Sequence, residues 1–278
     1  MIPIHENLAN KVAVITGGSG VLCSKMAQEL ARHQVKVAIV GRTESKVEAV
    51  KEEIVAAGGT AVAITADVLN KDSLLATKEQ ILEQFGRIDF LINGAGGNHP
   101  DAITEKEYYE ANSTSLSFFD LQENGFSDVF SLNFTGTFLA CQVFGEALLQ
   151  AENPAIINIS SMSAYTPLTK IPAYSAAKAA INNFTSWMAV HFAETGLRVN
   201  AIAPGFFITQ QNKDLLVDAE GEFTARSKKI IEATPMKKFG EPDQLLGALL
   251  FLLDSSYSSF ITGTTIAVDG GFNAYSGV

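Results

Sequence analysis

Seven short runs rich in β-branched residues, separated by longer amphipathic segments, constrain the fold of this 278-residue chain more than any other feature. The runs are VAVIT at 12–16, VKVAIV at 35–40, AVAIT at 61–65, IDFLIN at 88–93, AIINIS at 155–160, RVNAIA at 198–203 and TTIAVD at 264–269. Their continuous apolar character suits strands covered on both faces, and the strand–helix–strand order predicts right-handed crossovers between parallel strands. We therefore predict an α/β fold, a single Rossmann-type doubly wound parallel sheet of about seven strands flanked by helices.

The chain has no internal repeat, low-complexity tract or linker that would divide it, so we predict one domain over residues 1–278. Two regions interrupt the strand–helix rhythm. Residues 97–127 form a polar insertion, and residues 206–235 follow a strand end and have the pattern of a partly helical flap. Because long segments at the carboxyl ends of strands commonly carry function, we expect the flap to cover a substrate.

The overall charge and the cysteine content exclude several function classes. With 20 basic and 30 acidic residues the net charge is −10, so no basic face is expected for a nucleic acid. No signal peptide and no apolar run of roughly 20 residues is present, which predicts a soluble, cytoplasmic protein without a membrane partner. Cys23 and Cys141 are too few for a disulfide framework, and no cluster has metal-ligand spacing, so we predict no metal.

The segment TGGSGVLC at 16–23 follows the first predicted strand and precedes a helix. A glycine-rich turn at such a place lets backbone N–H groups approach a pyrophosphate at the positive end of the helix dipole. Val21 and Cys23, however, stand where two further glycines of the usual pattern would lie, although Gly20 could take over the close approach. The segment alone is equally compatible with dinucleotide binding and with a structural turn.

Tyr174 and Lys178 are four residues apart and follow Pro172, which favours a helix start, so both side chains would share one helical face. A nearby ammonium would lower the pKa of Tyr174 from its usual value near 10, which suits proton transfer to or from a substrate oxygen. Ser161, at the end of a predicted strand, would hold that oxygen by a hydrogen bond. A tyrosine–lysine pair at this spacing is also a common feature of helix surfaces, so the pair indicates a catalytic site only together with other candidate residues.

Asn133, in SLNFTG, is predicted to lie in the helix before the strand at 155–160. Its side chain could bind a backbone carbonyl and a water that relays protons through Lys178. The alternative is an ordinary helical asparagine whose hydrogen bonds are satisfied locally. Its occurrence together with Ser161, Tyr174 and Lys178 favours the first interpretation.

With these residues in place, the sequence resembles the short-chain dehydrogenase/reductase family over nearly the whole chain. The resemblance rests on TGGSGVLC, Asp67 in ADV, NGAG at 93–96, Asn133, Ser161, Tyr174, Lys178, PGFFIT at 204–209 and VDGG at 268–271. It implies a Rossmann fold, NAD(P) chemistry and a catalytic tetrad of Asn133, Ser161, Tyr174 and Lys178. The segments NGAGGNHP, PLTKIPAYSAAKAA, IAPGFFITQQN and VDGGFNAYSGV are most similar to the D-mannonate oxidoreductase (fructuronate reductase) branch, where a variant glycine loop is familiar.

The resemblance also implies which residues surround the cofactor. Gly17, Ser19, Val21 and Leu22 would surround the pyrophosphate, Asp67 and Val68 would meet the adenine, and Asn93, Ala95 and Gly96 would border the ribose. Tyr174, Lys178, Pro204, Gly205 and Thr209 complete the set, with Thr209 at the nicotinamide carboxamide. Without the resemblance, Asp67 could equally cap a strand end and Thr209 a helix.

The residues after the second strand bear on the choice between NAD and NADP. An acidic residue there would bind the ribose 2′-hydroxyl, whereas a basic residue accommodates a 2′-phosphate. The sequence VAIVGRT places Gly41 at the acidic position and Arg42 beside it. We therefore predict a preference for NADP(H), with NAD(H) as the alternative if Arg42 is only a solvated loop charge.

A sugar-acid substrate needs a cation or several donors for its carboxylate and a polar wall for its hydroxyls. The candidate substrate-binding residues are Asn98, His99, Ser163, Lys170 and Gln210, followed by Gln211 and Asn212. His99 could instead be a turn residue and Lys170 a surface charge. Four aromatic residues of the insertion, Tyr108, Tyr109, Phe118 and Phe119, are expected to pack it onto the domain.

We therefore predict a metal-free, reversible hydride transfer between NAD(P)H and a keto-sugar acid, D-fructuronate to D-mannonate in the reducing direction. The alternatives are a related reductase, such as a gluconate 5-dehydrogenase or polyol dehydrogenase, and a non-catalytic NAD(P)-binding sensor. The resemblance further suggests a homotetramer. The hydrophobic helices at 133–150 and 174–194 could supply its faces, unless they bury against the sheet alone.

Overall fold

The computed structural model describes residues 2–209, 216–218 and 220–277. Seven parallel strands form one sheet in the order β3-β2-β1-β4-β5-β6-β7. The strands are β1 (Val12–Thr16), β2 (Lys36–Gly41), β3 (Thr60–Thr65), β4 (Phe90–Asn93), β5 (Ala155–Ile159), β6 (Arg198–Pro204) and β7 (Thr265–Val268). Each predicted run contributes one strand, which confirms the doubly wound α/β sheet.

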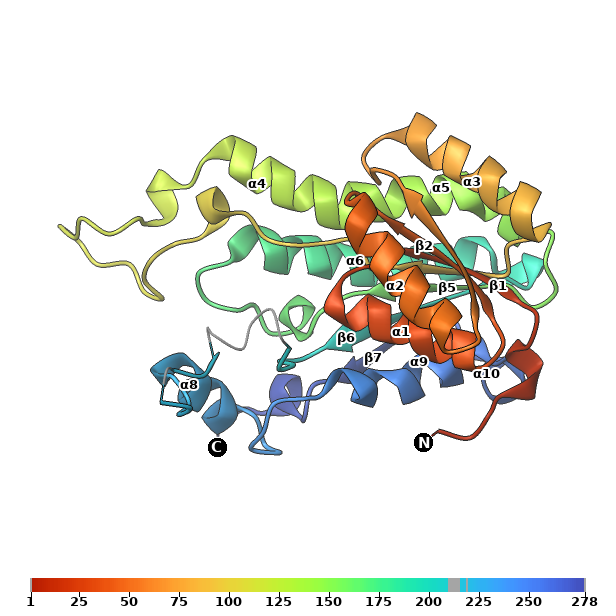
Figure 1. Cartoon of the computed structure of the whole chain (residues 1–278). Helices are drawn as coiled ribbons and strands as arrows, with labels where there is room; N and C mark the ends of the chain where they lie inside the picture. The colour runs from red at the N-terminus through yellow and green to blue at the C-terminus, as the bar shows by residue number, and fades with distance from the viewer. Residues whose placement is uncertain (1, 210–215, 219, 278) are drawn as a thin grey trace.

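Helices cover both faces of the sheet (Figure 1). On one face pack α1 (Val21–Arg32), α2 (Glu44–Ala56) and α9 (Leu246–Leu253), and their buried side chains form one core cluster with the strands. On the other face pack α3 (Lys71–Phe85), α5 (Gly136–Leu148) and α6 (Pro172–His191), which share a second cluster. Because both faces are buried, most strand residues from β1 to β6 are apolar.

The sheet changes its direction of growth at β1, which pairs with β2 on one side and with β4 on the other. Thr16 and Asn93, at the carboxyl ends of β1 and β4, are register partners. In open α/β sheets, ligands bind in the crevice outside the strand ends where the order reverses. The loop after β1 and the loop after β4 therefore flank the expected ligand position.

The insertion at 97–127 extends away from the sheet (Figure 1) and leads into α4 (Glu123–Phe130). It contains two short 3₁₀ turns, at Pro100–Ala102 and Phe118–Asp120. The expectation that its aromatic residues pack onto the domain is wrong. Tyr108 and Phe119 are 80% and 78% exposed, and the ring contacts of Phe119 among the described residues are edge-to-face with Tyr109 and Phe118 of the insertion itself.

The flap is partly helical, as predicted, because it contains α8 (Ala225–Ala233). Gln210, Gln211 and Asn212 lie outside the described residues. A short helix α10 (Ser255–Ser258) follows α9 before the last strand. Within the described part of the chain, no helix is long and apolar enough to cross a membrane.

Candidate active site

The loop between β1 and α1 is built for close backbone approach. Gly17 has φ of +62°, and a Cβ there would lie 2.7 Å from the backbone nitrogen of Ala95 in the loop after β4. Gly20 directly precedes α1, so the helix begins at Val21 with its first N–H groups turned toward the crevice. The loop thus keeps the conformation that an anion-binding turn requires, although Val21 and Cys23 replace two glycines.

Cys23 explains how α1 comes close to the sheet without a glycine at its own position. A Cβ on Gly94 would lie 2.1 Å from the Cys23 Sγ and 3.0 Å from the Thr16 carbonyl oxygen. The sulfur therefore fills the space that Gly94 leaves open. Cys23 is buried, and burial raises the pKa of its thiol to about 12, so the thiol is neutral at physiological pH.

The catalytic candidates come together at the carboxyl end of β5. Ser161 follows this strand, and Tyr174 and Lys178 share one face of α6, which begins at Pro172 as predicted. The side chains of Tyr174 and Ser161 are hydrogen bonded to each other. Lys178 donates a hydrogen bond from Nζ to the Ile159 carbonyl oxygen at 2.8 Å, and its Nζ lies 5.5 Å from the centre of the Tyr174 ring.

The direction of the Tyr174 pKa differs from our expectation. Burial raises the pKa of the Tyr174 phenol, and the hydrogen bond with Ser161 opposes that rise in part. Burial also lowers the pKa of Lys178 to about 8. The ammonium is directed to a main-chain oxygen of β5, and the phenol keeps its proton.

Asn133 lies in a π-helical turn, Ser131–Thr135, between α4 and α5. Its Nδ2 donates to the carbonyl oxygens of Gly97 at 2.7 Å and Val129 at 2.8 Å, and its Oδ1 accepts from the Gly97 N–H at 3.3 Å. A Cβ on Gly96 would lie 2.6 Å from the Asn133 Oδ1 and 3.3 Å from the Lys178 Nζ. Gly96 thus lies between these two groups, and the extra helical residue directs Asn133 at the loop after β4.

Polar contacts between β5 and α6 set the register of the helix. Besides Lys178 and the Ile159 carbonyl, Ser160 donates from Oγ to the Asn182 Oδ1 at 2.6 Å. Asn158 donates from Nδ2 to the Thr185 Oγ1 at 2.9 Å. Because these contacts lie along one face of α6, they fix where Tyr174 stands relative to Ser161.

A pocket of about 260 Å³ lies over these residues, and six of its lining residues are glycines: Gly17, Gly20, Gly94, Gly96, Gly97 and Gly205. The predicted residues that line it are Gly17, Val21, Leu22, Gly96, Ser161, Tyr174, Lys178, Pro204 and Gly205. Sequence reasoning did not single out Gly97, Ile159 or Ser160, which also line it. The glycines leave a cradle that side chains would otherwise fill, which suits a flat, elongated cofactor.

Several predicted cofactor residues lie around this pocket rather than in its wall. Ser19 lies beside Gly41 at the end of β2, where a Cβ on Gly41 would be 3.3 Å from the Ser19 Oγ, and Arg42 follows as an exposed residue. Asp67 accepts from the Leu69 N–H at 3.0 Å and so caps its own turn, while Val68 packs where a Cβ on Gly136 would lie. Ala95 and Thr209 are half-buried in the loops after β4 and β6.

The Asn93 side chain points into the protein and not toward the crevice. Its Nδ2 donates to the Asn158 Oδ1 at 2.9 Å and to the Cys141 Sγ at 3.2 Å, and the residue is buried. Only the backbone of Asn93 is therefore placed to border a ribose.

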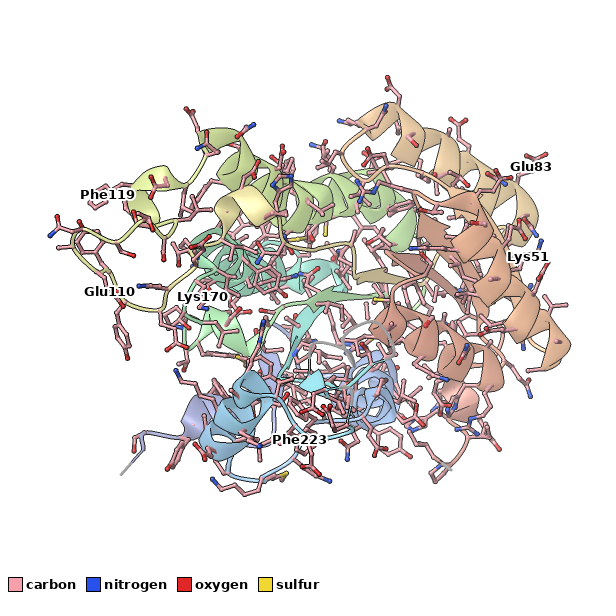
Figure 2. The ribbon with its side chains drawn as sticks, turned by 60° about the vertical axis from the view of Figure 1, so that its left-hand side comes forward. Lys51, Glu83, Glu110, Phe119, Lys170 and Phe223 are labelled. Atoms are coloured by element: carbon pink, nitrogen blue, oxygen red, sulfur yellow. The ribbon has the colours of Figure 1, made fainter. Side chains whose placement is uncertain are left out.

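The predicted substrate residues within the described part of the chain each make their own local contacts. Asn98 accepts from the His99 N–H, and the His99 Nδ1 accepts from the Asp101 N–H at 3.3 Å, so His99 caps a turn. Ser163 is buried, and its Oγ has no partner among the described residues. Lys170 is exposed, has φ of +72°, and accepts at its carbonyl oxygen from the Thr104 N–H at 3.0 Å. Figure 2 shows Lys170 on the side of the molecule from which Glu110 and Phe119 of the insertion project.

Comparison with known proteins places this geometry in context. The family model for short chain dehydrogenases matches residues 11–219. An uncharacterised oxidoreductase of Bacillus subtilis, UxuB, is 70% identical over 278 residues that cover 100% of both chains. A crystal structure from Haemophilus influenza with bound NAD, provisionally named a D-mannonate oxidoreductase, is 50% identical, covers 98% of both chains and has a TM-score of 0.95. A 2-dehydro-3-deoxy-D-gluconate 5-dehydrogenase of Escherichia coli is 33% identical over 275 residues, covering 99% of this chain and 100% of that protein.

Proposed function

Because this chain belongs to the short-chain dehydrogenase family, we propose that it interconverts a keto-sugar acid and its hydroxy acid, D-fructuronate and D-mannonate being the expected pair. The enzyme is an NAD(P)-dependent oxidoreductase that acts on a CH–OH group. The observation that carries the proposal is the convergence of Ser161, Tyr174 and Lys178 on the glycine-lined pocket. The similarity to the Haemophilus protein supports the choice of substrate.

The residues present fit a nicotinamide cofactor. The cradle of glycines, the start of α1 at Val21 and the crevice between β1 and β4 match what a dinucleotide requires. When bound, the cofactor supplies or accepts the hydride. We expect Gly17, Val21 and Leu22 to hold the pyrophosphate and Tyr174 and Lys178 to border the nicotinamide ribose.

In the reducing direction Tyr174 donates its proton to the substrate carbonyl oxygen. The Tyr174 phenol holds its proton at neutral pH and can donate it as the oxygen gains charge, and its raised pKa makes it a weaker acid than a free phenol until a cation approaches it. Ser161 donates a hydrogen bond to the same oxygen and steadies the developing charge. Lys178 positions the site from the β5 side, and Asn133 holds the loop after β4 through Gly97. We expect a water near Asn133 to carry protons onward through Lys178.

The choice between the two cofactors follows from the end of β2. Gly41 offers no carboxylate to a ribose 2′-hydroxyl, and Arg42 is exposed beside it. We therefore propose a preference for NADP(H). The NAD bound to the Haemophilus protein supports the alternative of NAD(H) use.

A panel of keto acids tests the substrate assignment. Purified enzyme is supplied with NADPH or NADH and with D-fructuronate, 5-keto-D-gluconate or the neutral ketose D-fructose, and kcat/KM is compared. The highest value for D-fructuronate supports the proposal, whereas the highest value for 5-keto-D-gluconate favours the second candidate, a gluconate-type dehydrogenase, in keeping with the similarity to the Escherichia coli protein. Tight cofactor binding without turnover of any CH–OH or carbonyl substrate would favour the remaining alternative, a non-catalytic NAD(P)-binding sensor.

We also propose a homotetramer with α5 and α6 at one of its interfaces. Trp187 on α6 is 57% exposed and stacks between Phe184 and His191, and Phe138 of α5 lies beside Phe184. Exposed aromatic residues on two adjacent helices are typical of a surface that a second subunit covers. Sedimentation of the purified protein distinguishes a tetramer from a monomer.

A further inference from the structure

The flap contributes a charged residue to a second pocket beside the catalytic one. This pocket shares Leu22 and Gly205 with the catalytic pocket and extends to Thr209 and to Leu216, Arg226 and Ile230 of the flap. Its remaining lining residues are Phe206 and Phe207, so Arg226 is its one charged lining residue in the part of the chain that the structure describes. A mostly apolar pocket with one cation and one hydroxyl, that of Thr209, is suited to an anionic group.

Helix α8 is held so that Arg226 faces this pocket. Thr224 caps the helix by accepting from the Ser227 N–H at 3.3 Å, and the buried Ser227 donates from Oγ to the Leu216 carbonyl oxygen at 2.6 Å. Ile230, one turn after Arg226, is buried against Leu216 and also lines the pocket. Because residues four apart share a helical face, burial of Ile230 fixes Arg226 on the pocket side.

The charge of Arg226 has no partner carboxylate among the residues that the structure describes. Among the described residues Arg226 forms no ion pair, whereas Lys229, one turn along α8, pairs with Glu107 of the insertion. Arg226 also lies in the first turn of α8, where the helix dipole disfavours a cation. In a chain with a net charge of −10, an unpaired guanidinium at the rim of the catalytic pocket is available to a ligand.

We propose that Arg226 binds the carboxylate of the substrate and is the residue that makes the enzyme specific for sugar acids. This inference rests on the proposed function. In a keto-sugar acid such as D-fructuronate the carboxylate lies at the far end of the chain from the keto group, with hydroxyl-bearing carbons between them. The keto group binds at Ser161 and Tyr174, and the carboxylate reaches across Gly205 to the guanidinium, which binds it by charge-assisted hydrogen bonds.

The test compares Arg226→Gln and Arg226→Lys with the wild type, with Lys228→Gln as the control because Lys228 is an exposed cation on the same helix outside the pocket. The steady-state constants are measured for D-fructuronate, 5-keto-D-gluconate, D-fructose and the cofactor. We expect Arg226→Gln to raise KM for the acids about 10- to 100-fold, the usual effect of losing a hydrogen bond to a charged group. KM for D-fructose and for the cofactor stays unchanged, Arg226→Lys restores part of the acid binding, and Lys228→Gln behaves as the wild type.

The outcomes separate this inference from the proposed function. An unchanged KM for the acids in Arg226→Gln overturns it, even where the wild type reduces D-fructuronate. A rise in cofactor KM without a rise in acid KM also overturns it, because it assigns Arg226 to the cofactor pyrophosphate. If the wild type prefers 5-keto-D-gluconate and Arg226→Gln loses that preference over D-fructose, the inference holds and only the identity of the acid changes. A wild type that prefers D-fructose to both acids contradicts the inference and the proposed function together.

Discussion

The Cys23 sulfur occupies the position that a side chain at Gly94 would need, 2.1 Å from an ideal Cβ there. The close approach between α1 and the sheet ordinarily depends on a glycine in the helix. Here the glycine is Gly94, in the loop after β4, which faces the helix residue Cys23. The two residues therefore form one steric unit, and their substitutions are coupled.

The Cys23–Gly94 pair predicts a rescue by exchange. Gly94→Ala overpacks the contact and lowers the free energy of unfolding by about 1–3 kcal/mol or more, with weaker cofactor binding. Cys23→Gly combined with Gly94→Ala restores stability toward the wild-type value. Chemical denaturation and cofactor titration measure both effects. Gly97→Ala is the control for stability, since a Cβ there meets only the Leu132 Cδ2 at 3.7 Å. Additive losses in the double variant would contradict the coupling.

Tyr174→Phe tests the proton donor. The variant keeps the ring in its place but removes the hydroxyl that is bonded to Ser161. We expect kcat to fall by about 10²–10⁴-fold, the usual contribution of general acid–base catalysis, while the dissociation constant of the cofactor stays near that of the wild type. Near-normal turnover would remove Tyr174 from this role.

Lys178→Met tests whether the buried lysine, which the activity requires, lowers the stability of the folded protein. Burial lowers the pKa of Lys178 from its usual 10.5 to about 8, so the folded state disfavours the ammonium. Below pH 8 Lys178 carries its proton in both the folded and the unfolded protein, so the full cost of burying the ammonium lowers the stability of the folded state. Between about pH 8 and 10.5 only the unfolded state binds the proton, so this residue's contribution to stability becomes more favourable as the pH rises. We expect Lys178→Met to be inactive and to have a higher free energy of unfolding than the wild type at pH 7.

The same variant provides a pH-dependent readout. The stability difference between Lys178→Met and the wild type should narrow from pH 8 to pH 10, which denaturation of the cofactor-free proteins at each pH measures. A difference that is constant over this range would show that Lys178 does not titrate near 8 in the folded protein.

The contact between Ser160 and Asn182 predicts a positioning effect on catalysis. Ser160→Ala removes the donor that ties β5 to α6 one turn after Lys178. We expect kcat to fall about tenfold and its pH profile to shift, with little change in cofactor KM, because Tyr174 no longer stands in register with Ser161. Asn183→Ala, at the exposed neighbouring position, serves as control. If Ser160→Ala is less stable but keeps the wild-type kcat and pH profile, the contact between Ser160 and Asn182 is structural only and does not position Tyr174.

Arg42→Ala tests the preference for NADP(H). Removal of the guanidinium should lower kcat/KM for NADPH about tenfold and leave the value for NADH unchanged, since only NADPH carries the 2′-phosphate. Lys46→Ala, an exposed cation in α2, is the control. A wild-type enzyme that strongly prefers NADH would contradict the use of Arg42.

The sequence was a good guide to features that depend on local pattern. The buried strands follow from runs such as VAVIT, and the start of α6 follows from Pro172, because strand burial and helix initiation depend on residues close together in the chain. The motifs around Ser161 and Tyr174 then identified the residues that meet at the end of β5.

Features that depend on contacts between distant segments were not predictable. The residues near Cys23 in the chain do not indicate that Gly94 leaves space for its sulfur. The hydrogen bond from Lys178 to the Ile159 carbonyl oxygen was not predictable either, because every residue type has a main-chain carbonyl. The same holds for Arg226, because its pocket also depends on Leu22 and on the loop after β6, which lie far from it in the chain. The insertion was misjudged because aromatic residues usually pack inward, and here they contact each other on an exposed surface.

The insertion is joined to both loops that border the pocket, through the Thr104 N–H to the Lys170 carbonyl oxygen and through Glu107 to Lys229 of α8. Three segments far apart in the chain are thus linked on one side of the molecule. Because exposed ion pairs contribute little to stability and are screened by salt, the Glu107–Lys229 link should weaken as the ionic strength rises. The buried contacts around Tyr174 are much less screened, so salt should loosen the link to α8 before it affects the catalytic residues.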